Sequence, residues 1–579
     1  MASQQQKKAT TGKGVAPARS WRYLTVLGGV LVVAVALCVR LVELHVLDRE
    51  FLRSQGEQRT VRTEPIDANR GVITDRHGDP LAVSTPVQTV WMNPQELNPE
   101  HEKLGELADV LGLDVDRVRS RLRNRSDRQF LYLRRKVQPS LASRAIELGL
   151  PGVYSRREYR RYYPAGEVAA HVVGLTNIDE VGQEGLELSF DHWLSGEEGR
   201  KRVLRDNRGR TIRDISLIRD ARPGNDLQLS LDLRLQYLAY RELKAVVQAH
   251  NARGGTLVML DATNGEVLAM VNQPSFNPND RGQRSPESLR NRAITDLFEP
   301  GSTIKPLTAA VALESGDYTP ESRINTSPGF MRMGGFTIRD NRDYGELDLT
   351  GIIARSSNVG ISKIAKDLTG TALQDFFYRV GFGQSTGIGF PGEAVGVLPA
   401  HATWRPVEVA ALSYGYGMSV NALQLAQAYM VIANGGIRYP VSLLSSDKAP
   451  RGTRVMSEDV AKQVRDMLLA VVEDGTGGRA RAALYNVGGK TGTVHLVGAR
   501  GYERDQYKAL FAGIGPVEDP RIVTVVAVDA PSSTEYYGGE VAAPVFGRVM
   551  SDALRLLNVR PDLEPELVDD AGRASGGQG

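Results

Sequence analysis

FEPGSTIKPLTAAVALESG, residues 298–316, places a serine and a lysine three positions apart, directly after Pro-Gly and at the start of an apolar helical pattern. Positions i and i+3 share one face of a helix, so the hydroxyl of Ser302 and the amine of Lys305 can meet there. Pro306 lacks the N–H that would bond the carbonyl of residue 302, so a helix can begin at the serine with little loss. The dipole at this end of a helix favours negative charge on the hydroxyl oxygen. The stretch therefore predicts a helix whose first turn carries a hydroxyl–amine pair.

A lysine can act as a base toward this serine only when its amine is uncharged. With an unperturbed pKa of about 10.4, deprotonation at pH 7 is unfavourable by roughly 3.4 units, or about 4.6 kcal/mol. Burial of the amine and a second positive charge nearby are the two ways to lower that pKa. The hypothesis that Lys305 is a base therefore predicts a second cation beside it.

The Ser-x-x-Lys pattern alone is weak, because Ser445 to Lys448 fits it equally well. That copy lies in a polar stretch with no apolar helix to bury its lysine, which predicts a surface loop. Ser-x-Asn occurs three times, at 275–277, 356–358 and 419–421, whereas Lys490-Thr491-Gly492 occurs once, in a strand-like run. Serines 302 and 356 and Lys490 follow one another along the chain in the order of the set that serine acyl-transfer enzymes acting on β-lactams use. Lys490 is then the expected second cation.

Composition excludes only a few classes of function. The chain has 579 residues, enough for two or three domains, and a formal net charge of +3 that indicates no particular partner. One cysteine, Cys38, excludes an intramolecular disulfide and a thiolate metal cluster. Eight histidines occur without a metal-binding spacing, so we expect no metal and no cofactor.

An apolar run of about 17 residues, from Tyr23 to Val39, is long enough to cross a bilayer when its flanks are included. Five basic residues precede it without any acidic one: Lys7, Lys8, Lys13, Arg19 and Arg22. This bias predicts a cytoplasmic N-terminus (1–22), a retained transmembrane helix (23–45) and a remainder outside the cytoplasm. A cleaved signal peptide and a lipoprotein at Cys38 are the alternatives, but neither has the small residues that its cleavage site needs.

Arginine is dense from residue 117 to 161, which in a cytosolic protein would suggest nucleic-acid binding. The predicted topology places this segment outside the cytoplasm, so we expect no nucleic acid. The alternatives are a solvated module laced with ion pairs and a surface that faces an anionic wall or a partner protein.

The strand pattern predicts an α+β catalytic domain. A boundary with an alternating strand is expected at 221–232, and two strands follow in 256–271, where Asn264-Gly265 suggests a hairpin with a type I′ turn. Three more strands are expected late in the chain, the last two joined at PVEDP (516–520). Two strands before a helical middle and three after it give a five-stranded antiparallel sheet flanked by helices. The tail at 559–579 is acidic and then Gly/Ser-rich, which is typical of disorder.

With these motifs in place, the chain resembles the class B penicillin-binding proteins, and among them the division-specific transpeptidases of FtsI type. The similarity runs from about residue 20 to 557 and rests on six further stretches. They are RGVITDRHGDPLAVS (70–84), RRYYPAGEVAAHVVG (160–174), GQEGLE (182–187), NRAITDLFEPGSTIKP (291–306), SYGYGMSVNALQLAQAY (413–429) and YYGGEVAAPVF (536–546).

The resemblance implies a serine D,D-transpeptidase that cross-links peptidoglycan stem peptides ending in D-Ala-D-Ala and that β-lactams inhibit. It makes Ser302 the nucleophile and Lys305 its base, with Ser356 as a proton shuttle and Asn358 as a contact for Lys305 and substrate. Further roles fall on the strand motif: Lys490 and Thr491 hold the substrate carboxylate, Gly492 permits close approach, and the backbone N–H groups of Ser302 and Thr493 form the oxyanion hole. No metal or cofactor is implied.

The resemblance also implies a layout and partners. An elongated N-terminal pedestal of dimerisation type is expected at 46–225 and the transpeptidase domain at 226–558. The expected partners are an FtsW-type glycan polymerase and other membrane proteins of the division machinery, at the division site of the bacterial inner membrane. The alternatives are an elongation-type transpeptidase, a serine β-lactamase or D,D-carboxypeptidase, and an anchored scaffold that binds β-lactams. His495, Arg70 and Asp75 are expected to be structural.

Overall fold

The computed structural model describes residues 20–47, 50, 60–205, 211–280, 282, 284–446, 448–498, 501–532 and 534–563. Most of the expected cytoplasmic tail and of the expected disordered tail, residues 1–19 and 564–579, lies outside the described residues. The chain forms two compact units. One combines the segment up to Asp67 with Glu198–Ala221, and the other combines Ala68–Glu197 with Arg222 onward.

The first unit holds a long apolar helix and a small sheet. Helix α1 (Ser20–Val42) continues as a π-helical turn, η1 (Glu43–Leu47). The stretch Trp21–Val46 has a mean hydropathy of 2.5 and side chains that are not buried by the protein, so by length and composition it can cross a membrane. The predicted span, 23–45, falls within it. Strands β1 (Val61–Ile66), β8 (Gly199–Arg205) and β9 (Thr211–Arg219) form an antiparallel sheet in the order β1-β8-β9.

The second unit begins with a mixed sheet whose longest strand is β3 (Pro80–Met92). Strand β3 pairs with β2 (Ile73–Thr74), with β4 (Leu131–Val137) and, along ten residues, with β5 (Val153–Tyr162). Helices α3 (Leu104–Leu111), α4 (Val115–Asn124) and α5 (Pro139–Glu147) cover the far end of this sheet around a core that includes Met92, Leu107 and Leu122. The strand predicted at 221–232 is only β10 (Leu227–Gln228), and it joins this sheet parallel to β2.

A buried ionic cluster joins the start of this segment to its end. Arg70 Nε donates to Glu187 Oε2 at 2.7 Å and Arg161 Nε donates to Glu187 Oε1 at 2.6 Å, with side chains that are 2% exposed or less. Arg70 also pairs with Asp191 at 2.8 Å. The carboxylates of Glu187 and Asp191 thus offset two guanidinium charges that would be costly to bury alone. The cluster agrees with the expectation that Arg70 is structural, and Arg161 is a buried member of a segment expected to be solvated.

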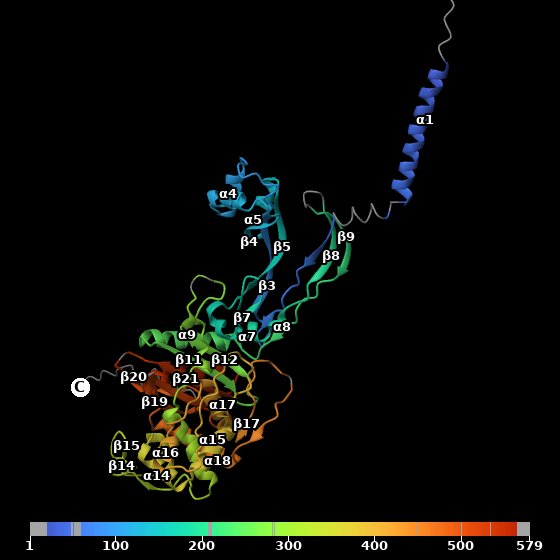
Figure 1. Ribbon diagram of the computed structural model, residues 1–579. Coiled ribbons are helices and arrows are strands. Elements are labelled where there is room, and N and C mark those ends of the chain that lie inside the picture. The colour runs from blue at the N-terminus through green and yellow to red at the C-terminus, as the bar shows by residue number, and fades with distance from the viewer. Residues whose placement is uncertain are drawn as a thin grey trace, which may run out of the picture. The chain divides into compact units, whose positions relative to one another are not determined.

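The second unit also contains the predicted five-stranded antiparallel sheet, whose strand order is β12-β11-β21-β20-β19 (Figure 1). Their bounds are β11 (Gly254–Asp261), β12 (Val267–Gln273), β19 (Gly488–Gly498), β20 (Gly501–Gly515) and β21 (Ile522–Asp529). Two strands precede the helical middle and three follow it. β19 therefore lies at one edge of the sheet, with β20 as its only strand neighbour in the described chain.

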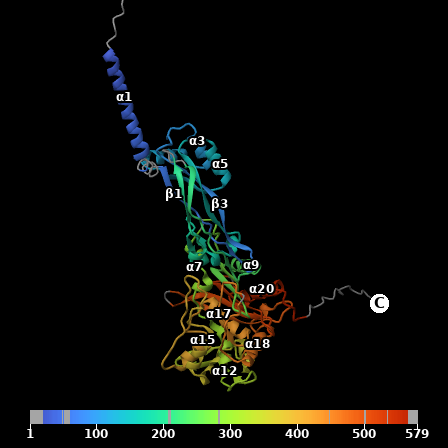
Figure 2. The same cartoon turned by 90° about the vertical axis from the view of Figure 1, so that its right-hand side faces the viewer.

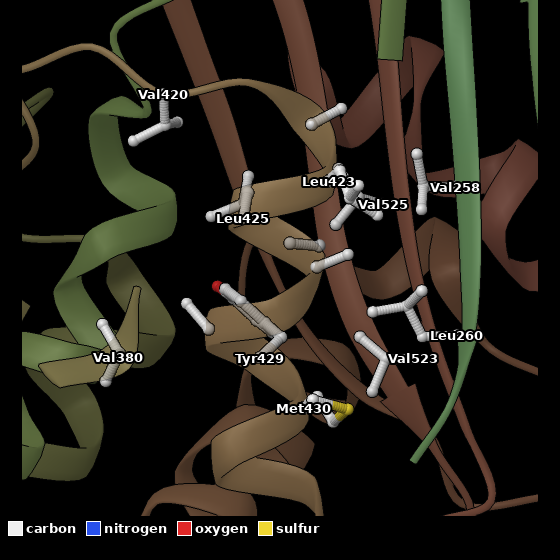
Figure 3. Packing of buried hydrophobic residues seen from close by; sticks show 14 of the residues in the cluster. Val258, Leu260, Val380, Val420, Leu423, Leu425, Tyr429, Met430, Val523 and Val525 are labelled. Carbon is white, nitrogen blue, oxygen red and sulfur yellow. The ribbon is translucent and has the colours of Figure 1, made fainter. Parts of the chain in front are cut away.

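Both faces of this sheet are buried, so its central strands are apolar at successive positions rather than alternating. Val258 and Leu260 face helix α17 (Ala422–Ala433), whereas Leu257 and Met259 face α9 (Leu233–Ala249) and α20 (Ala543–Leu556). Figure 3 shows Leu423 and Met430 of α17 against Val525 and Val523 of β21. In Figure 2, α9 and α20 lie side by side on their face of the sheet.

The hairpin between β11 and β12 is present, but its turn is not the predicted two-residue type I′ turn. Gly265 has a φ of +78°, whereas Asn264 is not among the residues with positive φ. Gly265 N–H bonds the carbonyl of Asp261 at 3.0 Å, and Asn264 Oδ1 accepts from Glu266 N at 2.9 Å. The asparagine thus closes a longer loop through its side chain, an alternative that Asn-Gly permits equally. The second predicted hairpin joins β20 to β21.

The remaining elements are short or line the helical middle. Before α9 they are η2 (Gly166–Val168), α6 (Ala170–Val173), β6 (Leu175–Thr176), β7 (Gly182–Glu184), α7 (Gly185–Ser189) and α8 (Asp191–Leu194). After β12 they are α10 (Pro286–Leu289), α11 (Arg292–Thr295), η3 (Gly301–Ile304), α12 (Lys305–Glu314), β13 (Ile324–Asn325), β14 (Phe330–Met333), β15 (Phe336–Arg339), β16 (Glu346–Leu347), α13 (Leu349–Arg355), α14 (Asn358–Asp367), α15 (Gly370–Val380), α16 (Pro406–Ser413), β17 (Ile437–Arg438), β18 (Thr453–Arg454), α18 (Glu458–Glu473), η4 (Gly478–Ala480) and α19 (Gly538–Val541).

Replacing Glu187 with alanine should destabilise the second unit strongly, because among the described residues it leaves the buried Arg161 without a carboxylate partner and Arg70 with Asp191 alone. We expect a loss of about 3–5 kcal/mol in the free energy of unfolding, measured by near-UV circular dichroism on the detergent-solubilised protein. Glu147→Ala, at an exposed position on α5, is the matched control and should change it by no more than about 0.5 kcal/mol. Equal effects of the two substitutions would contradict this role of the cluster.

Candidate functional site

The Ser302 turn is a single 3-10 turn, η3, that leads into the α-helix α12 at Lys305. The predicted helix thus begins three residues later than expected. Pro306 explains the difference: the Ser302 carbonyl cannot bond residue 306 and instead accepts from Lys305 N–H. Ser302 is half-buried, at the entrance to a helix whose other first-turn residues are buried.

Three contacts hold this turn in place. Gly301 adopts a φ of +54° and donates its N–H to the carbonyl of Gly415 at 3.1 Å. Thr303 Oγ1 donates to the Pro300 carbonyl at 2.7 Å, and the fully buried Tyr429 donates its O–H to the Thr303 carbonyl at 2.7 Å. In Figure 3 the phenol oxygen of Tyr429 points away from the sheet. These contacts on both sides of Ser302 fix the backbone of the turn and so the direction of its side chain.

Lys305 is completely buried, and its amine is turned toward the Ser-x-Asn motif. Nζ donates to the Ser356 carbonyl at 2.6 Å and to Asn358 Oδ1 at 2.7 Å, and lies 3.1 Å from Ser356 Oγ. Among the described residues, no hydrogen bond joins Nζ to Ser302 Oγ. Burial lowers the pKa of Lys305 well below its usual value, and the nearby Lys490 lowers it further, while the carboxylate of Asp340 opposes the shift. Lys490 is therefore the second cation that the sequence predicted.

The Ser-x-Asn motif is a sharp break between two helices. Helix α13 ends at Arg355, Ser356 takes the left-handed conformation with a φ of +60°, and Ser357 begins α14 as its N-cap by accepting from Gly360 N. A non-glycine residue in this conformation carries strain that the surrounding structure must hold. The break turns Ser356 and Asn358 toward the same amine.

Lys490 reaches the same hydroxyl from the edge strand β19. Its Nζ donates to Ser356 Oγ at 3.0 Å and to the Thr491 carbonyl at 3.2 Å, and the side chain is fully buried. Burial lowers the pKa of Lys490 to about 7. Two amines with depressed pKa values thus contact one serine oxygen.

Strand β19 packs tightly against the Ser302 turn. A Cβ on Gly492 would lie 3.0 Å from Thr303 Cγ2, and a Cβ on Gly301 would lie 2.4 Å from Val494 Cγ1. Thr491 Oγ1 lies 2.8 Å from Thr476 Oγ1, and Thr493 Oγ1 accepts from Gly538 N at 3.0 Å. All eight residues predicted for the site therefore come from segments that are in direct contact, and Ser302 lies on the turn that packs against β19.

The competing motif copies are elsewhere. Ser445 and Lys448 are both exposed, as predicted for a surface loop. Ser275 bonds the Glu167 carbonyl, and Asn421 caps α17 by accepting from Gln424 N. His495 packs on Tyr507, with ring centroids 4.6 Å apart.

Sequence reasoning missed Asp340, Tyr429 and Thr476, which support the site through hydrogen bonds. Asp340 and Thr476 lie outside all the quoted motifs, and Tyr429 ends the stretch 413–429 without a predicted role. All three meet the site only through tertiary folding. Aspartate, tyrosine and threonine are common residues, and the sequence around these three gives no signal for a supporting role.

Comparison with known proteins agrees with this geometry. Residues 255–551 match the family model of the penicillin-binding protein transpeptidase domain, and residues 65–229 match that of the penicillin-binding protein dimerisation domain. The chain is 41% identical over 571 residues to the peptidoglycan D,D-transpeptidase FtsI of Escherichia coli K12, covering 96% of both chains. It is also 41% identical over 545 residues to the probable peptidoglycan D,D-transpeptidase PbpC of Pseudomonas aeruginosa, covering 94% of this chain and 96% of that protein.

Solved structures give the same result. Penicillin-binding protein 3 of Mycobacterium tuberculosis, complexed with aztreonam, superposes with a TM-score of 0.67 at 28% identity, covering 87% of this chain and 99% of that one. The transpeptidase domain of Burkholderia pseudomallei penicillin-binding protein 3 superposes with a TM-score of 0.54 at 40% identity, covering 58% of this chain and 98% of that one. With both domains matched and FtsI relatives aligned over nearly its whole length, this chain belongs to the class B penicillin-binding proteins of FtsI type.

Proposed function

We propose that this protein is a membrane-anchored serine D,D-transpeptidase that cross-links peptidoglycan stem peptides through an acyl-enzyme on Ser302 and that β-lactams inhibit. The observation that carries the proposal is the buried Lys305 amine, bonded to Ser356 and Asn358 and repelled by Lys490. Burial and the neighbouring amine both lower the pKa of Lys305 and so favour its uncharged form, which is the form that can act as a base. The names of the FtsI and PbpC relatives support the same activity.

The proposed first step forms one bond and breaks another. Ser302 Oγ attacks the penultimate D-Ala carbonyl of a stem peptide, and Lys305 Nζ takes the hydroxyl proton. The C–N bond to the terminal D-Ala then breaks, and the leaving amine receives a proton through Ser356 Oγ, which contacts both lysines. In the second step an amine of a neighbouring stem attacks the ester, loses its proton to the same base, and Ser302 regains its hydroxyl. No other reactant is needed.

The remaining roles are proposed for the edge strand. Lys490 and Thr491 would hold the terminal carboxylate of the substrate, and Gly492 would let an extended peptide approach the backbone. The open edge of β19 supports this assignment, because an extended peptide can add to such an edge as a further strand. The backbone N–H groups of Ser302 and Thr493 would stabilise the oxyanion, worth about 3 kcal/mol each.

The cellular setting is also a proposal. We infer a cytoplasmic N-terminus, a single span at 23–45, a pedestal at 46–225 and a transpeptidase domain at 226–558 in the periplasm, at the division site. Basic residues before α1 and the domain matches support it. The FtsI relatives favour the division role over elongation. An FtsW-type glycan polymerase and other membrane proteins of the division machinery are the proposed partners.

Ser302→Ala should abolish covalent capture of a fluorescent penicillin and rescue of septation in cells depleted of the native protein, because no other group can form the ester. Labelling on gels and cell length measure the two effects. Ser445→Ala, in the exposed copy of the motif, is the matched control and should behave as wild type. Rescue by Ser302→Ala would show that the main task of the chain is not catalysis.

With a stem-peptide donor, the wild-type protein should give cross-linked dimers when an acceptor amine is present. We measure dimers and released D-Ala by mass spectrometry. Release of D-Ala without any dimer in the presence of the acceptor would identify a D,D-carboxypeptidase instead.

Lys490→Gln should shift the pH dependence of acylation. Its acid limb, the range in which the rate falls as the pH falls, should move to higher pH by about 1 unit. A lysine base fails as pH falls through its pKa, and loss of the neighbouring positive charge lets the pKa of Lys305 rise. The second-order rate constant for penicillin acylation, measured between pH 5 and 10, reports the shift. Lys448→Gln, an exposed lysine, is the control and should leave the limb in place. A limb that stays fixed or moves down in Lys490→Gln would contradict the role of Lys490 as the second cation.

A further inference from the structure

Asp340 stands directly behind the Ser-x-Asn motif, at the end of strand β15. Its Oδ1 accepts from Asn358 N at 2.5 Å and from Val359 N at 3.0 Å, and its Oδ2 accepts from Ser357 Oγ at 2.6 Å. The two N–H groups belong to the first turn of α14, where the helix itself provides no acceptor. One carboxylate thus binds three consecutive residues next to Ser356.

The residue before Asp340 completes the attachment. Asn358 Nδ2 donates to the Arg339 carbonyl at 3.0 Å, which leaves Asn358 Oδ1 to accept from Lys305 Nζ at 2.7 Å. The amide can satisfy both bonds in one orientation only, with its oxygen toward the amine. The residues at the end of β15 therefore hydrogen-bond both the backbone and the side chain of Asn358.

Asp340 also carries one of the two charges that act on the Lys305 amine. From β19, Lys490 lowers the pKa of Lys305, and from the end of β15, Asp340 raises it. The other groups that face the amine, Ser356 and Asn358, are neutral hydrogen-bond partners. The two charges lie on segments that come from distant parts of the chain.

We propose that Asp340 is a positioning residue of the acyl transfer: it anchors the 357–359 turn so that Ser356 and Asn358 stay bonded to Lys305, and its charge balances that of Lys490. The inference rests on the proposed function, since it assigns Asp340 a part in preparing the same base. It goes beyond an ordinary helix cap, which would add stability without affecting how the base titrates.

The discriminating variant is Asp340→Asn, which keeps an acceptor for the α14 N–H groups and removes the charge. With that charge gone, Lys305 is easier to deprotonate, so the acid limb of penicillin acylation should move to lower pH by about 0.5–1 unit, opposite to the shift expected for Lys490→Gln. Asp343→Asn is the matched control, because this exposed carboxylate in the same loop binds only Ser327 and Gly345 among the described residues. If the acid limb of Asp340→Asn lies at the same pH as the limbs of wild type and Asp343→Asn, the charge-balancing role is overturned.

Two further variants test the anchoring. Asp340→Ala removes the charge and also leaves the first turn of α14 without its acceptor. Its limb should move as in Asp340→Asn, and its acylation rate on the plateau above the limb should fall about 10- to 100-fold. Asp340→Glu keeps the charge but displaces it, so the rate should fall while the limb stays with wild type. This variant carries the test if Asp340→Asn does not fold. Wild-type rates in Asp340→Ala or Asp340→Glu overturn the anchoring.

The outcome is separable from that of the proposed function. If Ser302→Ala still captures penicillin, the proposed acyl-enzyme is wrong, whatever Asp340 does. If wild type acylates at Ser302 with an acid limb that the Asp340 variants leave unchanged in position and in rate, the proposed function stands and the positioning role fails.

Discussion

The site depends on one constraint: the amine of Lys305 is completely enclosed by protein. Enclosure lowers the pKa of the amine by disfavouring its charged form, and the buried N–H groups must be given hydrogen-bond acceptors. The Ser356 carbonyl and the Asn358 amide oxygen supply them. Much of the surrounding structure follows from this requirement. The left-handed break at Ser356 exists where the two acceptors must point at one atom, and apolar helices exclude water from around it.

The position of β19 at the edge of the sheet answers a second requirement. A site that acts on a peptide must leave one line of backbone accessible and still support the amine from behind. β19 pairs with β20 along one edge, and one face of the strand packs against the Ser302 turn, where glycines at 301 and 492 remove the Cβ atoms that would hold the segments apart. The same strand thus supplies a buried lysine and an edge without a strand neighbour in the described chain.

Much of this arrangement could be predicted from sequence because it depends on local chemistry. The motif triplet, the buried second cation and the five-strand count follow from residue types, order and periodicity, and the apolar helix at the N-terminus follows from its length. The differences arise where a local pattern permits two outcomes. Pro306 suits both an α-helical start and a 3-10 turn, and Asn264 closes its loop with a side chain instead of a positive φ. Asp340 and Tyr429 were beyond prediction because their partners, Asn358 and Thr303, are neighbours only in the folded chain.

The strand order of the sheet has a consequence for folding during synthesis. β11 lies between β12 and β21, and Thr256, near the start of the domain, pairs with Ala527, near its end. Contacts of such high sequence separation form slowly, because the entropy of closing the intervening loop is lost before the pairing compensates for it. One whole side of β11 therefore stays unpaired until almost the entire polypeptide has been synthesised. A nascent chain exposes an apolar edge throughout this interval, and the order of its strands makes protection from aggregation part of its biogenesis.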